Sequence, residues 1–259
     1  MLRVIIGILI PFIGTTLGSA CVFLMRKSLS DRLYRALLGF TAGVMIAASV
    51  WSLLLPSINL SEHLNKLAFL PAVVGFFFGV IFLFILDRVT PHLHVAAKLP
   101  EGPASKLSRT MLLVIAVTLH NIPEGMAVGV VFSSVLNGNV AVSSAAALVL
   151  SIGIAIQNFP EGAIISIPLK AEGNTRFKSF AYGTLSGIVE PIAAVITLLI
   201  TSVIASALPY LLSFAAGAMI YVVIEELIPE ATKNDKADIC TIGFTIGFAI
   251  MMIFDVAMG

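Results

Sequence analysis

The chain has 259 residues, of which 59% are hydrophobic and 11% are charged, and its formal net charge is +1 at pH 7. Soluble domains carry about 25% charged residues, so this composition excludes a soluble globular protein and indicates a protein embedded in lipid. The net charge is near zero without a basic cluster, so nothing indicates nucleic-acid binding. Cys21 and Cys240 lie in apolar segments and support neither a disulfide framework nor a cysteine metal site.

Eight apolar segments are long enough to cross a membrane as helices. Such a helix needs about 20 mostly apolar residues, because it rises about 1.5 Å per residue through a hydrocarbon core about 30 Å thick. In chain order the segments are residues 3–25, 35–56, 69–88, 109–133, 142–169, 178–205, 209–231 and 239–258. The first stays apolar beyond Pro11 without a clear cleavage site, so we expect a retained helix and not a signal peptide. The longest connection, 89–108, is rich in proline and is expected to be a flexible loop, so we predict one transmembrane domain over residues 1–259.

The lysines and arginines indicate how the helices are oriented. Of the 15 such residues, all except Arg3 and Lys66 fall in or beside the odd-numbered connections. Cytoplasmic loops carry the excess of positive charge in membrane proteins, so we expect the odd connections in the cytoplasm and both termini outside. The predicted location is the plasma or inner membrane of the cell, with multiple passes.

The sequence contains internal repeats of opposite orientation. Leu37–Ile46 in the second span reads LLGFTAGVMI, and Leu211–Ile220 in the seventh reads LLSFAAGAMI. Gly75–Asp87 in the third span resembles Gly243–Asp255 in the eighth; the first span resembles the sixth weakly, and the fourth and fifth share a motif. Paired spans cross the membrane in opposite directions, which is typical of transporters with a substrate site near the midplane. We therefore predict an all-α integral membrane protein whose eight helices form an inverted-repeat 3+2+3 bundle.

The motif shared by the fourth and fifth spans carries the chemistry. His120–Gly125 reads HNIPEG and Gln157–Gly162 reads QNFPEG. Residues three and four apart share a helix face, so the imidazole, amide and carboxylate groups of each motif lie on one side. A carboxylate at the bilayer centre costs about 2.5–3.5 kcal/mol. Glu124 and Glu161 therefore need a compensating partner, which we expect to be a bound cation or protons.

Two further features favour a metal site. Pro123 and Pro160 each remove a backbone donor and free carbonyls one turn earlier, a distortion that is tolerated at this depth where it lines a polar cavity. Glu190 precedes Pro191 in the sixth span, where the repeat has Ile10 in the corresponding place. One imidazole, amide oxygens and three carboxylates suit Zn²⁺, Fe²⁺ or Mn²⁺, and no thiolate imposes a soft-metal preference.

The paired motifs, Glu190 and the eight spans resemble those of the ZIP (Zrt/Irt-like) metal transporters, especially the bacterial GufA-like branch, over nearly the whole chain. The resemblance implies a site for two adjacent metal ions between spans four, five and six. The implied ligands of the transported ion are His120, Glu124, Gln157 and Glu161. The implied ligands that complete the second position are Asn121, Asn158 and Glu190, with Glu124 and Glu161 bridging the two. Relatives often carry His or Asp where this chain has Gln157 and Asn158, and neutral amides bind divalent ions more weakly.

Acidic and histidine side chains at the cytoplasmic ends of two spans form a candidate exit site. ZIP relatives use matching positions, after the third span and at the end of the seventh, to receive metal that leaves the central site. The residues are Asp87, His92, His94, Glu225 and Glu226, with Glu230 one turn further on. The other interpretation is that these side chains are solvated, as we also expect for Glu62 and His63 on the outside.

The leading hypothesis is a transporter, not an enzyme, that imports divalent transition-metal ions toward the cytoplasm through the site on spans four to six. Zinc is the first candidate and iron, manganese and cadmium are the others; the metal is the transported substrate, as one ion or two adjacent ions. An intramembrane metalloenzyme is the alternative, but the His-Glu-x-x-His zinc motif does not occur. A proton or monovalent-ion carrier would leave His120 and the paired amides unexplained. The expected partners are metal ions and the lipid bilayer; ZIP relatives are often dimers, so a homodimer is allowed, although no motif identifies an interface.

Overall fold

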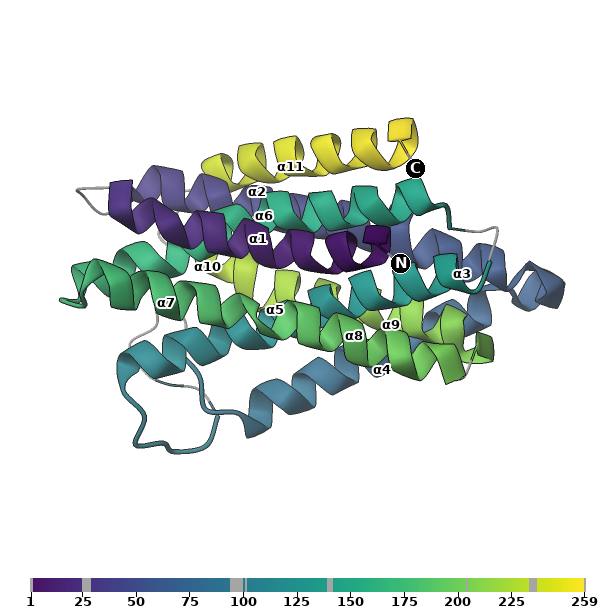
Figure 1. Ribbon diagram of the computed structural model, residues 1–259, viewed down its shortest axis with the longest axis horizontal. Coiled ribbons are helices and arrows are strands. Elements are labelled where there is room, and N and C mark those ends of the chain that lie inside the picture. The colour runs from purple at the N-terminus through teal and green to yellow at the C-terminus, as the bar shows by residue number, and fades with distance from the viewer. Residues whose placement is uncertain are drawn as a thin grey trace.

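The computed structural model describes residues 2–24, 29–93, 100, 102–138, 142–203, 205–232 and 237–258. These residues form an elongated bundle of long helices, and the two ends of the chain lie at the same end of it (Figure 1). Eight helical stretches are long and apolar enough to cross a membrane. The prediction of an all-α integral membrane protein with eight transmembrane helices is therefore confirmed, and no extended strand occurs among the described residues.

Some spans are single α-helices and others change along their length. The single helices are α1 (Leu2–Leu24), α4 (Phe69–Val89), α5 (Arg109–Leu136), α6 (Ser144–Ala171) and α11 (Ala237–Met258). The composite spans are α2 (Asp31–Ala48) with α3 (Leu55–Leu60), α7 (Arg176–Gly187) with α8 (Val189–Val203), and α9 (Leu208–Val222) with α10 (Ile228–Thr232).

Serine and threonine caps define where several spans begin. Ser30, Ser108, Ser143 and Thr175 each accept a hydrogen bond from the backbone N–H three residues later. Such a cap satisfies one of the donors that a helix leaves without a partner at its first turn. The second span consequently begins at Asp31, one turn before the start predicted from apolar character alone.

Two of the composite spans contain a π-helical segment at equivalent places in the repeat. Ser49–Leu54 joins α2 to α3, and Val223–Leu227 joins α9 to α10. Both segments begin at the same distance from the paired sequences LLGFTAGVMI and LLSFAAGAMI. Pro56 and Pro229 follow, and each lacks the N–H that would bond to a carbonyl inside the segment. The repeated distortion agrees with the predicted inverted repeat.

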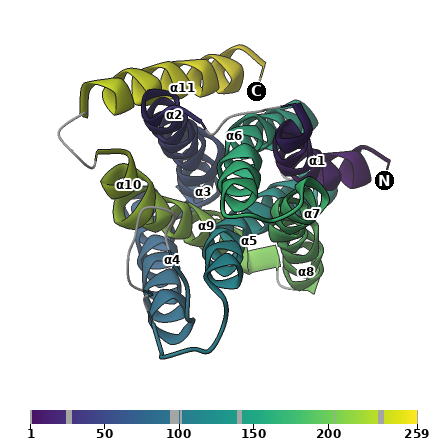
Figure 2. The same cartoon turned by 90° about the vertical axis from the view of Figure 1, so that its left-hand side faces the viewer.

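The helices pack in pairs that also follow the repeat. α1 packs along α6, α2 along α11, α4 along α9 and α5 along α8. In the repeat, α2 corresponds to α9 and α11 to α4, so the pair α2/α11 corresponds to the pair α9/α4. In the same way, the pair α1/α6 corresponds to the pair α8/α5. Seen along the bundle, α2, α5, α6 and α9 are inner helices and α1, α4, α8 and α11 are outer helices (Figure 2). Burial agrees with this division. In the 18-residue apolar stretch of each span, 72% is buried for α6 and only 22% for α11.

Glycines bring each inner helix into backbone contact with its outer partner. A Cβ added to Gly18 would overlap the backbone carbonyl of Phe159, so α1 and α6 touch through their main chains. Gly129 lies against α8 in the same way, Gly43 against α11 and Gly217 against α4. Small residues that allow close backbone approach are a common basis of helix association in membranes.

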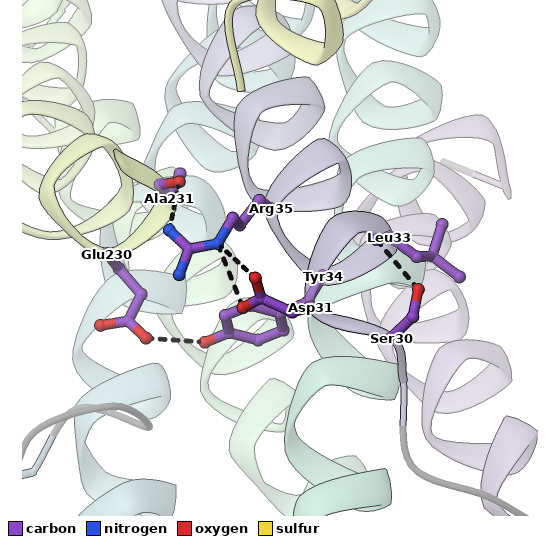
Figure 3. A network of polar contacts seen from close by, with 7 residues as sticks. All are labelled: Ser30, Asp31, Leu33, Tyr34, Arg35, Glu230 and Ala231. Atoms are coloured by element: carbon purple, nitrogen blue, oxygen red, sulfur yellow. Dashed lines mark hydrogen bonds and ion pairs between the residues drawn. The ribbon is translucent and has the colours of Figure 1, made fainter. Parts of the chain in front are cut away.

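A polar network, part of it buried, connects the beginning of α2 to α10 (Figure 3). The Arg35 guanidinium donates hydrogen bonds to the Asp31 carboxylate at 3.1 Å and to the Ala231 carbonyl at 3.0 Å. The neighbouring Tyr34 hydroxyl donates to the Glu230 carboxylate at 3.0 Å. Arg35 is 4% exposed, so water does not compete for its hydrogen bond to the Ala231 carbonyl, whereas its Asp31 partner is exposed.

We expect Arg35→Leu to lower the free energy of unfolding by about 1–3 kcal/mol, because the Ala231 carbonyl loses its Arg35 donor in buried surroundings. The apparent melting temperature of the detergent-purified protein measures this loss. Arg32→Leu is the matched control, since Arg32 is exposed on the same turn and its replacement should change stability by less than about 0.5 kcal/mol. Equal shifts in the two variants would contradict the role assigned to the network.

Candidate metal centre

The two predicted motifs lie next to each other on the inner helices α5 and α6. Both helices continue through Pro123 and Pro160 without ending, although each proline still leaves a carbonyl one turn earlier without its helical donor. The polar side chains of both motifs and Glu190 are at most 8% exposed. The residues that share this burial are His120, Asn121, Glu124, Gln157, Asn158, Glu161 and Glu190.

Glu190 reaches the same region from a span that is interrupted there. α7 ends at Gly187 and α8 begins at Val189, so Glu190 lies in the first turn of α8. A Cβ added to Gly125 would overlap the backbone of Glu190, which places α8 directly against the motif of α5. Interrupted helices near the midplane are typical of binding sites in transporters.

Five of these residues form what we call the carboxylate–amide group: Asn121, Glu124, Gln157, Asn158 and Glu190. The Gln157 amide donates to one oxygen of Glu124 at 2.5 Å. The Asn121 amide donates to the Ser186 carbonyl at 3.0 Å, next to the break between α7 and α8. These contacts fix the orientation of side chains from α5 and α6 and connect them to the backbone at the end of α7.

Buried oxygens without hydrogen-bond partners are concentrated at this site. An unsatisfied buried polar group costs about 1–3 kcal/mol, and more if it is charged, so such oxygens need a partner. A divalent cation would supply one, because carboxylate and amide oxygens are suitable ligands for it. The oxygens concerned are Asn121 Oδ1, Glu124 Oε2, Gln157 Oε1, Glu161 Oε2 and Glu190 Oε2. The donor set therefore fits a metal ion.

His120 does not point its Nε2 atom toward the carboxylate–amide group. Its Nε2 atom pairs instead with the carboxylate of Glu226, which lies in the π-helical segment after α9. Glu161 is next to this pair, and all three residues line one cavity. Glu226, predicted at the exit, thus contacts the histidine of the first motif directly.

The candidate ligands are consequently divided into two sets in this conformation. Among the described residues, no three His, Cys, Asp or Glu side chains are close enough together to hold one ion by themselves. Amide oxygens have to complete a site at the carboxylate–amide group. A site that uses His120 Nε2 requires its pair with Glu226 to open.

A cavity of about 60 Å³ leads from this region toward one end of the bundle. Its polar lining consists of His120, Glu161, Glu226, Tyr34 and Glu230, and the remaining lining is apolar. One water molecule needs about 10–15 Å³, so the cavity has room for more than one. Two of these polar residues, Tyr34 and Glu230, also belong to the network of Figure 3.

Residues 101–255 match the family model described as ZIP Zinc transporter. The chain belongs to the ZIP family. It is 33% identical to zinc transporter ZIP11 of Homo sapiens over 95% of this chain and 94% of the relative. It is 36% identical to zinc transporter ZIPB of Bordetella bronchiseptica over 96% and 79%, and 32% identical to zinc transporter GufA of Myxococcus xanthus over 95% and 96%. The predictions of ZIP membership, of a multi-pass membrane protein and of a divalent-metal transporter rather than an enzyme are confirmed.

The structure brings only part of the predicted exit site together in this ZIP protein. Asp87 and His92 form an ion pair at 3.0 Å, and His92 Nδ1 lies 2.8 Å from the Thr90 carbonyl. Burial lowers the pKa of His92, but these contacts outweigh it and raise the pKa to about 9. Glu225 is exposed and does not line the cavity. His94 lies outside the described residues.

Sequence patterns missed two polar contacts. Thr15 donates a hydrogen bond to Glu190 at 2.8 Å, and the one sequence signal near it is the pair of glycines Gly14 and Gly18, four residues apart. Asp255 accepts one from Ser52 at 2.6 Å and lines a pocket of about 300 Å³ at the end of the bundle opposite Tyr34. Asp255 ends a repeat segment as Asp87 does, and this correspondence is a signal that could have identified it.

Proposed function

We propose that the protein imports divalent transition-metal ions toward the cytoplasm through the site on α5, α6 and α8. Zinc is the first expected substrate, and iron, manganese and cadmium are the others. The proposed ligands are His120, Asn121, Glu124, Gln157, Asn158, Glu161 and Glu190. In this proposal the whole chain, residues 1–259, acts as one transmembrane domain.

The observation that carries the proposal is the set of buried oxygens without hydrogen-bond partners on three adjoining spans. Their concentration at one place is costly unless a cation binds there. The zinc transporters among the relatives support zinc as the first substrate. Two adjacent ions fit the division of the ligands, one at the carboxylate–amide group and one beside His120 and Glu161.

The distribution of charge and the position of the cavity support the proposed direction of transport. The end of the bundle toward which the cavity leads carries basic residues in the terminal turns of helices and in the loop before α5: Arg32, Arg88, Lys106, Lys170 and Arg176. The excess of positive charge marks the cytoplasmic side of a membrane protein. In this proposal an ion leaves the central site through this cavity, past Glu226 and Glu230, and enters the cytoplasm.

The test is uptake of Zn²⁺ into proteoliposomes that contain the purified chain. We expect saturable uptake above that of protein-free liposomes, and competition by Fe²⁺, Mn²⁺ and Cd²⁺ to rank the substrates. Folded protein that carries none of these ions would contradict the proposal. Metal-independent proton flux through the same preparation would instead favour a proton carrier.

A further inference from the structure

Thr15 on the outer helix α1 contacts the candidate metal centre without belonging to either motif. The residue is 1% exposed, and its Oγ1 atom lies 2.8 Å from Oε1 of Glu190 and 3.4 Å from the Pro11 carbonyl. The Thr15 hydroxyl is the donor and Oε1 of Glu190 is the acceptor. The contact to Glu190 is the shorter of the two, so the hydroxyl hydrogen is directed at the carboxyl group and not at the Pro11 carbonyl.

Two glycines make room for this contact. A Cβ on Gly187 would lie 2.9 Å from Thr15 Cβ and 3.0 Å from Glu190 Oε1, so any larger residue there would separate the two side chains. A Cβ on Gly162, in the second motif, would overlap the backbone carbonyl of Thr15. Thr15 therefore sits in a space that exists only because α6 and α7 carry glycine at these positions.

The contact divides the two oxygens of Glu190 between different roles. Oε1 is occupied by Thr15, whereas Oε2 has no hydrogen-bond partner and belongs to the carboxylate–amide group. A carboxylate held by one oxygen presents the other in a fixed direction. We propose that Thr15 is the positioning residue of Glu190, which it orients as a one-oxygen ligand of the metal ion. This inference rests on the proposed metal-binding function of the site.

The test compares Thr15→Val, which keeps the shape and removes the hydroxyl, with Thr15→Ser, which keeps the hydroxyl. Zn²⁺ binding to the detergent-purified protein and the KM and maximal rate of uptake are measured together. Loss of a hydrogen-bond partner behind a metal ligand typically weakens metal binding about 10–100-fold. We expect this loss, with a matching rise in KM, for Thr15→Val and recovery of most of the affinity for Thr15→Ser.

The neighbouring Thr16→Val is the matched control. Thr16 lies on the same helix, and its hydroxyl has no hydrogen-bond partner among the described residues, so the same substitution should leave Zn²⁺ affinity unchanged. Unchanged affinity in Thr15→Val, or equal losses in Thr15→Val and Thr15→Ser, would overturn the inference. Thr15→Ala replaces Thr15→Val if melting of the purified protein shows that the valine variant is unfolded.

A double-mutant comparison separates positioning from packing. If Thr15 acts through Glu190, Thr15→Val should change Zn²⁺ affinity less than about twofold when Glu190→Ala is already present. If Thr15→Val still lowers Zn²⁺ affinity by the full amount when Glu190→Ala is present, the inference is overturned and Thr15 has a packing role. If the unmodified protein neither binds nor transports Zn²⁺, the proposed function fails together with this inference. If the unmodified protein binds and transports Zn²⁺, and Thr15→Val has the same Zn²⁺ affinity and KM, only this inference fails.

Discussion

Glu124→Ala is expected to abolish metal uptake into proteoliposomes. Glu124 is completely buried, one of its oxygens accepts the Gln157 amide at 2.5 Å, and the other has no partner. The substitution removes both the charge and the oxygen that a cation would need at the carboxylate–amide group. Loss of an outer partner of a ligand costs about 10–100-fold, so loss of the ligand itself should reduce uptake by more than about 100-fold.

Two controls make the result specific to the site. Glu62→Ala makes the same substitution at an exposed position outside the bundle's interior, and its uptake should equal that of the unmodified protein. Glu124→Gln keeps the shape of the side chain but not its charge, and it should also lose most uptake because neutral amides bind divalent ions weakly. Uptake by folded Glu124→Ala at the unmodified rate would exclude a transport role for this site.

Gly125→Ala is expected to destabilise the bundle and to impair uptake at the same time. Alanine is about 1 kcal/mol better than glycine inside a helix, so local propensity alone predicts stabilisation. The new Cβ would however lie 2.8 Å from Cα of Glu190 and would overlap its carbonyl. Excess volume in a packed interface costs about 1–3 kcal/mol, and here it also separates Glu124 on α5 from Glu190 on α8.

Gly153→Ala on α6 is the matched control. A Cβ at this position would meet only the end of the Met251 side chain, its Sδ and Cε atoms. Methionine has several rotatable bonds and adapts to such changes, so stability and uptake should remain close to those of the unmodified protein. Apparent melting temperature and Zn²⁺ uptake are measured for both variants. Equal losses would show that glycine is needed for the helix itself and not for the contact between α5 and α8.

Much of the fold was predictable because its signals are periodic or compositional. Apolar length predicted the eight spans, and the pair LLGFTAGVMI and LLSFAAGAMI predicted the repeat. The repeat in turn accounts for the pairing of α2 with α11 and of α4 with α9. The seven residues predicted from the motifs and from Glu190 are all buried on adjoining spans, as midplane ligands should be. Their role as ligands stays a prediction until metal binding is measured.

The details that escaped prediction depend on helical phase and on contacts between spans. A 3.6-residue period cannot say which of two adjacent glutamates faces inward. The π-helical segment Val223–Leu227 buries Glu226 against His120 and leaves Glu225 exposed. Thr15 is one of many small residues on α1, and only packing against the glycines of α6 and α7 distinguishes it. Such contacts become visible only once the spans are placed in three dimensions.

The backbone contacts between inner and outer helices also have an electrical consequence. At Gly18, Gly43, Gly129 and Gly217 the main chains touch so closely that neither water nor a hydrated ion fits between the paired helices. The cavity, by contrast, is lined by α2, α5, α6 and the span of α9 and α10, one helix from each pair. Leakage of ions across the membrane is thereby blocked at these contacts. The membrane voltage can then fall along the central path, where the carboxylates lie.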